Sequence, residues 1–283
     1  MLQEPLASPP FRGKLIMMAS AEPSEPIFAR PRVILAGARA IYIGPGLALS
    51  PHRNSVATLA IALAVPFEIA WPLTSDRPAE TRQIALIPPN TLHHLIAAGP
   101  MMFVYLDALA DDQRTIVARI TPRPEEQARI AADCADIATG STAADVVRGL
   151  LAILGLSDPQ DAISPKGLAA AIRAIDDRPN DFGSAKIAAS LAGMSESHFH
   201  RAIKRTIGVP FRRYRLWRRL AIAAIALKGG ANLTDAAMAG GFASSAHFSA
   251  TFRRMFGIKP SLLINAQARF DVVHFACVAT TLP

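Results

Sequence analysis

Short apolar runs separated by turn-forming residues occupy the first part of the chain. Four such runs cover residues 41–43, 56–65, 84–87 and 102–106, and Gly or Pro residues follow the first three of them. Apolar runs of this length that end at Gly or Pro residues are typical of β-strands. We therefore expect residues 31–110 to form a compact β-sandwich or β-barrel.

Helical periodicity replaces the strand pattern from about residue 124. Apolar residues then recur at a spacing that predicts amphipathic helices; these residues are Ile130, Cys134, Ile137, Val146, Val147, Leu150, Leu151 and Leu154. We expect residues 111–163 to form a helical linker and a candidate dimerisation region. The leucines at its end fit a seam between two copies of the chain, and packing inside one chain explains them equally well.

The stretch from 184 to 269 repeats one helical pattern at a spacing of 49 positions. Gly193 precedes Ser-Glu-Ser-His-Phe at 195–199, and Gly241 precedes Ser-Ser-Ala-His-Phe at 244–248. A glycine permits the tight turn that joins two closely packed helices. After each Phe, residues suited to the core recur every three or four positions, which predicts a helix with one buried face. Each copy is therefore predicted to be a helix-turn-helix.

The same periodicity separates the buried from the outward side chains on the second helix of each copy. The inward positions are Phe199, Ala202, Ile203 and Thr206 in the first copy, and Phe248, Thr251, Phe252 and Met255 in the second. The outward positions are candidates for DNA contact: Ser197, His200, Arg201, Lys204 and Arg205 in the first copy, and Ser245, Ala246, Ser249, Ala250, Arg253 and Arg254 in the second. We expect Arg201 and His200 to read bases and the other four basic residues to contact phosphates.

Capping residues support both units. Ser195 is placed to cap the first outward helix, and Asn232 with Asp235 has the spacing of a capping box. His198 and His247 occupy equivalent places beside the core Phe residues, where a packing or capping role is expected.

A continuous helix is predicted between the two copies, over residues 209–228. Its 20 residues would span about 30 Å, close to the roughly 34 Å between successive major grooves on one side of a duplex. One stripe of this helix carries Arg212, Arg215 and Arg219, which we expect to pair with the intervening phosphates. The Gly-Gly pair at 229–230 predicts its end.

Charge is concentrated in the repeated segment. Residues 184–269 contain 14 Lys and Arg against 2 Asp and Glu, while the whole chain has a net charge of +8. The rest of the chain is therefore mildly acidic. A basic helical module joined to an acidic one is what nucleic-acid binding requires, because neutralisation of phosphates drives the association.

Residues 184–263 resemble the DNA-binding domain of the AraC/XylS family of bacterial transcription regulators. The residues of the family pattern that this chain contains are Gly241-Phe242, the two Phe residues at 248 and 252, and Gly-Ile-Lys-Pro at 257–260. Ile203 replaces the core aromatic of the first copy, and Ala250 stands where the family usually has Arg. The resemblance implies binding to double-stranded promoter DNA, activation or repression of transcription, and RNA polymerase as a partner. It also implies that the second motif supplies methyl or phosphate contacts instead of an arginine reading a base.

The N-terminal region resembles the cupin-like sensor domains of the same family. Residues 51–54 stand where cupins begin their first motif, and residues 88–94 look like the strand and turn that bear their last histidine. Asn54 occupies a position where a second His is often found, and no Glu follows at the usual distance, so we expect no metal and no cofactor. The resemblance implies a small-molecule effector pocket; its candidate residues are His52, Phe67, Trp71, His93 and His94.

Composition limits the other functional classes. The longest apolar run has ten residues, against the roughly 20 that a bilayer span needs, so no membrane segment is expected. Cys134 and Cys277 lie far apart, which argues against a disulfide framework or a cysteine zinc site and fits the cytoplasm. Two alternatives to a regulator remain: a metal-dependent cupin enzyme, and an architectural DNA binder without sequence preference.

The predicted architecture is α+β. It comprises a disordered leader at 1–30, a cupin-like barrel or sandwich at 31–110, a helical linker at 111–163, and an all-α domain with two helix-turn-helix motifs at 164–264. A short apolar tail at 265–283 has no assigned element.

Overall fold

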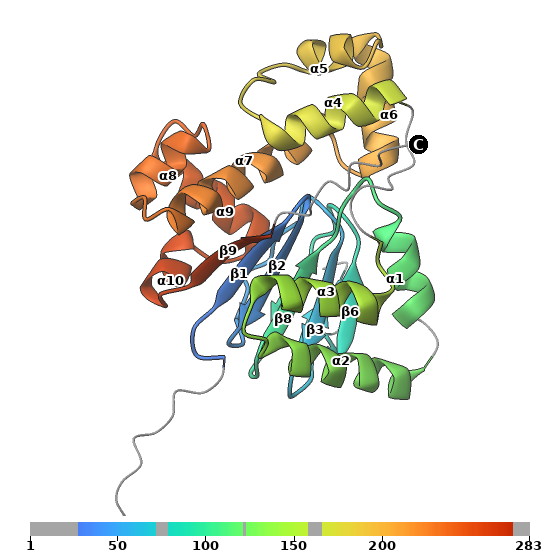
Figure 1. Cartoon of the computed structure of the whole chain (residues 1–283), viewed down its shortest axis with the longest axis vertical. Helices are drawn as coiled ribbons and strands as arrows, with labels where there is room; N and C mark the ends of the chain where they lie inside the picture. The colour runs from blue at the N-terminus through green and yellow to red at the C-terminus, as the bar shows by residue number, and fades with distance from the viewer. Residues whose placement is uncertain (1–27, 72–78, 121–122, 158–165, 274–283) are drawn as a thin grey trace, which may run out of the picture.

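The computed structural model describes residues 28–71, 79–120, 123–157 and 166–273 of the 283-residue chain. Within these residues an N-terminal α+β region precedes a group of helices, and a last strand returns to the first sheet (Figure 1). Most of the predicted leader and Cys277 lie outside the described residues.

The strands of the described residues form two sheets that share a core. The larger sheet has the order β6-β3-β8-β2-β1-β9 and the smaller one β5-β4-β7, so the region is a sandwich and not a closed barrel. The four predicted runs overlap β2, β3, β6 and β8. The strands are β1 (Arg32–Ala36), β2 (Arg39–Gly44), β3 (Thr58–Ala62), β4 (Phe67–Ala70), β5 (Glu80–Arg82), β6 (Ile84–Ile87), β7 (His94–Ile96), β8 (Met101–Tyr105) and β9 (Arg269–Val273).

The larger sheet is covered on both faces, and for that reason its central strands lack polar alternation. Every residue of β2 and β3 is buried. Three helices cover one face (Figure 1): α1 (Asp112–Ile120), α2 (Pro124–Ala138) and α3 (Ala143–Leu154). The smaller sheet covers part of the other face, and the C-terminal helices cover the rest. A strand that is buried on both faces has a nearly continuous apolar sequence.

The helices predicted as a linker are part of this layer. Leu150 and Leu154 are 1% and 0% exposed and pack inside one chain, whereas Leu151 is half-buried. Arg39 on β2 forms a buried ion pair with Asp112 on α1, with a shortest Nη2–Oδ1 distance of 2.6 Å. This pair fixes the first helix against the sheet.

Seven helices follow among the described residues. They are α4 (Lys166–Asp177), α5 (Ala185–Leu191), α6 (Glu196–Ile207), α7 (Phe211–Lys228), α8 (Leu233–Ala239), α9 (Ser245–Phe256) and α10 (Pro260–Asn265). The connecting helix α7 begins two residues later than predicted. Val209 precedes Pro210, and the residue before a proline is disfavoured in the helical conformation. None of the helices described is both long and apolar enough to cross a bilayer.

The apolar tail supplies a strand. Residues 269–273 form β9, which pairs in parallel with β1 at the edge of the larger sheet. The backbone N–H of Arg269 donates to the Pro31 carbonyl at 2.8 Å, and Arg32 pairs with Asp271. The last described strand therefore lies beside the first one (Figure 1).

Aromatic side chains join the larger sheet to the C-terminal helices. The Tyr105 ring on β8 lies 5.1 Å from the Trp217 ring on α7 and 5.4 Å from the Phe256 ring on α9, measured between centroids. The backbone N–H of Ser50 donates to the Gly257 carbonyl at 3.0 Å, at the end of α9. Aromatic contacts and a backbone hydrogen bond thus both link the two regions.

Candidate nucleic-acid interface

The two helix-turn-helix units are built in the same way at equivalent positions. Ser195 Oγ accepts a hydrogen bond from the N–H of His198 at 3.3 Å, and Ser244 Oγ accepts one from the N–H of His247 at 3.1 Å. The turn glycines have φ angles of 65° and 71°, a left-handed conformation that favours glycine. The predicted repeat is therefore present as two helices, α6 and α9, that begin and end alike.

Helix α6 buries one face and exposes the other. Phe199, Ala202 and Ile203 are buried as predicted, while Thr206 is only half-buried and Ile207 takes the fourth core position. The predicted DNA-contacting side chains are all exposed: Ser197, His200, Arg201, Lys204 and Arg205. These predicted contacts place one His, two Arg and one Lys in solvent, and the exposed Glu196 carboxylate lies 3.7 Å from His200 Nε2.

Helix α9 has a smaller polar face. Phe248, Thr251 and Met255 are buried, and Phe252 is half-buried toward the first sheet. Of the predicted contacts, Ala246, Ala250, Arg253 and Arg254 are exposed, and Ser245 and Ser249 are half-buried. The two arginines lie in the last turn, so the first turns of α9 carry no Lys, Arg, Asp or Glu side chain.

The stripe of arginines on α7 is largely engaged within the protein. Arg215 Nε donates to the Pro179 carbonyl at 2.8 Å, before the first helix-turn-helix. Arg219 Nε donates to the Gly240 carbonyl at 2.8 Å, in the second turn, and its guanidinium lies 4.4 Å from the Phe242 ring centroid. Burial lowers the pKa of both guanidinium groups. These two side chains orient the units on α7, and only Arg212 of the three is fully exposed.

The capping box before α8 forms with one difference. Asn232 Oδ1 accepts from the N–H groups of Thr234 and Asp235, at 2.9 and 3.0 Å. The Asp235 carboxylate accepts from the Asn232 side-chain amide at 2.7 Å and not from its backbone. The helix start is nevertheless where the sequence predicts it.

The histidines predicted to line an effector pocket lie at the junction of the two regions. His52 and His93 are buried as a pair, with ring centroids 4.1 Å apart, and each Nδ1 is 2.9 Å from a nearby backbone carbonyl oxygen. His52 lies beside Gly257, at the end of α9. Phe67 is buried between the sheets, and Trp71 and His94 are half-buried. None of these five residues lines the apolar cavity described next.

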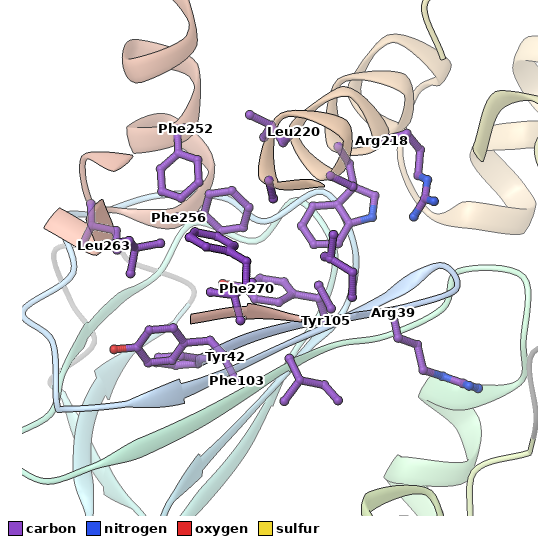
Figure 2. Close-up of a pocket in the computed structure, with 18 of the residues that line it drawn as sticks. Arg39, Tyr42, Phe103, Tyr105, Arg218, Leu220, Phe252, Phe256, Leu263 and Phe270 are labelled. Atoms are coloured by element: carbon purple, nitrogen blue, oxygen red, sulfur yellow. The ribbon is translucent and has the colours of Figure 1, made fainter. Parts of the chain in front are cut away.

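An apolar cavity of about 90 Å³ lies between the larger sheet and the C-terminal helices. Figure 2 shows its aromatic walls: Tyr42, Phe103 and Tyr105 on the sheet, Phe252 and Phe256 on α9, and Phe270 on β9. The resemblance implied a pocket within the N-terminal domain. The cavity lies instead where one face of the open larger sheet meets the C-terminal helices. No local sequence signal marks this contact.

Polar groups are few in the cavity wall. The indole Nε1 of Trp217 is buried without a hydrogen-bond partner. Arg39 and Arg218 lie at one end of the cavity, away from Phe252 and Leu263 (Figure 2). Each arginine has a carboxylate partner, Asp112 for Arg39 and Asp176 for Arg218 at 3.2 Å. The cavity is therefore apolar along most of its length, with the Trp217 N–H in its wall and two ion-paired arginines at one end.

Three basic residues that the sequence patterns did not identify lie where the sandwich meets the C-terminal helices, beside the predicted DNA-contacting face. They are Arg53 on a loop of the sandwich, Arg213 on α7 and Lys259 after α9. Arg213 Nη2 donates to the Arg53 carbonyl, and the Ser55 hydroxyl donates to the Arg213 carbonyl at 3.3 Å. Their proximity comes from tertiary packing, so helical periodicity could not reveal it.

The described part of the chain was searched for groups of metal ligands and for reactive thiols. There, no group of three or more His, Cys, Asp or Glu side chains is arranged to hold a metal ion. Cys134 is buried against the sheet, and burial raises the pKa of its thiol to about 12. Such a thiol remains protonated and unreactive at neutral pH.

Comparison with known proteins places the C-terminal helices in a known domain class. Residues 188–265 match the family model described as a helix-turn-helix domain. This range runs from within α5 to the end of α10, so it includes both units and the connecting helix. No curated protein matches the chain significantly.

Two solved structures are similar in fold over most of the chain, and a third matches a smaller part of it. An apo form of a ToxT variant from Vibrio cholerae is 12% identical, with coverage of 81% of this chain and 97% of that one and a TM-score of 0.52. A second ToxT structure from Vibrio cholerae is 12% identical, with coverage of 84% and 97% and a TM-score of 0.50. A regulator from Chromobacterium violaceum with an AraC-type DNA-binding domain is 26% identical over 36% of this chain and 92% of that one, with a TM-score of 0.33.

Proposed function

We propose that the chain belongs to the AraC/XylS family of bacterial transcription regulators, that it binds specific promoter sites through α6 and α9, and that it regulates transcription there. The proposal includes double-stranded DNA and RNA polymerase as partners, a cytoplasmic location, and no enzymatic activity of its own. A homodimer is compatible with it but does not follow from Leu150 and Leu154, which are buried inside one chain.

One observation carries this proposal: two helices that are capped alike each turn a polar face to solvent. On α6 this face includes His200 and Arg201, which are exposed and lie away from the buried face of the helix. Exposed Arg and His side chains on a helix that follows such a turn are suited to base edges in the major groove. The charge of this region supplies the electrostatic attraction to phosphate.

The two helix-turn-helix units differ in the contacts that they can make with DNA. Helix α6 has Arg201 in its middle, whereas α9 has Ala250 at the equivalent position and arginines only in its last turn. We propose that α6 reads bases by hydrogen bonds. Helix α9 contributes phosphate contacts through Arg253 and Arg254, and methyl contacts to thymine through its alanines.

The effector is proposed to bind in the cavity between the sheet and the helices. Ligand pockets commonly occupy about 300–1,000 Å³, against about 90 Å³ here. A ligand of ordinary size must therefore separate α7 and α9 from the sheet. The Trp217 N–H, which lacks a hydrogen-bond partner, favours an apolar molecule with one hydrogen-bond acceptor. Because α7 joins the two units, such a movement changes how α6 and α9 are presented to DNA.

Genome-wide mapping of bound sites, followed by affinity measurements on the purified full chain, tests the regulatory function. We expect binding to recovered sites at least about 10³-fold tighter than to random DNA of equal length. Equal affinity for both would indicate an architectural DNA binder. For the effector, thermal-shift screening should find apolar ligands whose stabilisation is lost in Ala224→Leu, which fills the cavity, and kept in Ala118→Leu, which alters an exposed position on α1.

A further inference from the structure

The loop of the sandwich that carries Arg53 contacts the C-terminal end of α9, where the N–H of Ser50 donates to the Gly257 carbonyl at 3.0 Å. Arg53 is exposed on this loop, and its Nη1 donates to the Asn90 carbonyl at 2.7 Å. Its own carbonyl accepts from Arg213 at the start of α7. These bonds fix the position of Arg53 from both sides, since one partner is in the sandwich and the other in the helices.

The loop continues the surface of α9. A cleft between the two regions is lined by Ser50 and Pro51 of the sandwich and by outward residues of α9 and the turn after it: Ser249, Ala250, Arg253, Arg254 and Lys259. Ser249 and Ala250 belong to the face predicted to enter a groove. The first domain therefore borders the DNA-contacting face instead of lying behind it.

The charges around this cleft are of one sign. We define the junction cluster as Arg53, Arg213, Arg253, Arg254 and Lys259. Within the described parts of the chain, no carboxylate lies within ion-pair distance of any member. Arg213 Nε is buried without a hydrogen-bond partner. Burial, and then the charges of Arg53 and Arg254, lower the pKa of the Arg213 guanidinium. Such a cluster is stabilised when an anion neutralises it.

We propose that Arg53 of the sandwich contacts a DNA phosphate beside the site of α9, so that the first domain forms part of the DNA-binding surface. The proposal rests on the function proposed above. The phosphate backbone fits because the cluster is continuous with the outer face of α9 and because DNA carries a negative charge about every 1.7 Å of its axis. Arg53 then supplies a backbone contact near the helix that lacks a base-reading arginine.

The salt dependence of DNA binding by the full chain tests this contact. Each phosphate contact contributes about 0.9 to the slope of log affinity against log salt. We expect Arg53→Ala to lower the magnitude of the slope by about 0.9 and to weaken binding to specific and random DNA by the same factor. Arg148→Ala is the matched control, because it removes one exposed charge from α3 on the helical layer and should leave the slope unchanged.

Arg53→Lys separates charge from loop structure. Lysine keeps the charge and loses the geometry of the bond to the Asn90 carbonyl, so its slope should stay near that of the wild type. An Arg53→Ala slope equal to that of the wild type would overturn the proposal, and so would tighter binding, which would mean that the loop blocks α9. Equal losses in Arg53→Ala and Arg53→Lys would also overturn it. The wild-type preference for specific sites tests the proposed function separately.

Discussion

Arg32 and Asp271, 239 positions apart in the sequence, form an ion pair with an Nε–Oδ2 distance of 2.8 Å at the edge of the larger sheet. Their side chains are 11% and 14% exposed. The pair joins β9 to β1 just after α10, the helix that follows the second unit. Movement of α9 and α10 away from the sheet therefore requires β9 to detach or the sheet edge to follow.

Removing one member of this pair should destabilise the protein. Asp271→Asn leaves the Arg32 guanidinium shielded from water with fewer acceptors, which should lower the free energy of unfolding by about 2–3 kcal/mol. Urea denaturation of the full chain measures the loss. Asp145→Asn removes a carboxylate from an exposed pair with Arg148 and should cost less than about 1 kcal/mol. Similar losses in both variants would show that the strand pairing does not depend on the ion pair.

Arg201 and Arg253 should have different effects on DNA recognition. Arg201→Ala should cost about 1–3 kcal/mol on the specific site and relax preference at one position, because it removes a base contact. Arg253→Ala should weaken all sequences alike, because it removes a phosphate contact. Competition binding with specific and random duplexes measures both. If the two variants lost the same factor on both kinds of DNA, their assigned roles would be wrong.

An arginine at position 250 should add recognition by the second unit. Ala250 is exposed in the middle of α9, at the position equivalent to Arg201 of α6. Ala250→Arg should therefore tighten binding or alter the preferred bases in the second groove. Selection from a randomised duplex library measures the preference. Ala118→Arg on α1 adds the same charge away from α9 and serves as the control; an unchanged preference in Ala250→Arg would show that α9 is not docked.

The buried histidine pair should make stability fall in acid. Burial, and next the charge of His93, lower the pKa of His52 to about 3, against about 6.5 in an unfolded chain. The unfolded state thus gains a proton that the folded state does not. The contribution of His52 is complete above about pH 6.5 and is lost as the pH falls toward 3.

At about pH 5 this loss from His52 should be about 2 kcal/mol. His52→Asn keeps a donor for the Ser50 carbonyl and has no titrating group. The stability difference between wild type and variant should therefore shrink by about 2 kcal/mol between about pH 7.5 and pH 5. Asp176, whose pKa burial raises to about 6, is common to both proteins and cancels. If the stability difference between wild type and variant did not change with pH, His52 would have to be protonated at pH 5 in the folded state as well.

Local patterns in the sequence predicted the helices of the two units well. The caps at Ser195 and Asn232, the buried Phe199 and Phe248, and the exposed face of α6 follow from spacing over a few residues. The four predicted strand runs also correspond to strands. These features depend on periodicity and on turn chemistry, which are properties of neighbouring residues.

Contacts between distant segments were not predictable in this way. The parallel pairing of β9 with β1, the cavity under Trp217 and the approach of the Arg53 loop to α9 join segments far apart in the chain. Arg215 and Arg219 share a stripe with Arg212 on α7, yet they donate to turn carbonyls because those turns pack against the helix. Spacing identifies a common face of a helix but not what covers it.

Hydroxyl-radical footprinting of the full chain on a recovered genomic site tests most directly whether the two units act together on one face of a duplex. Two protected segments about 10 base pairs apart, with protection at one lost in Arg201→Ala, are expected. Inserting about five base pairs, half a helical turn, between them should abolish simultaneous protection. A single protected segment, or uniform protection without preference for any site, would contradict recognition by paired helices.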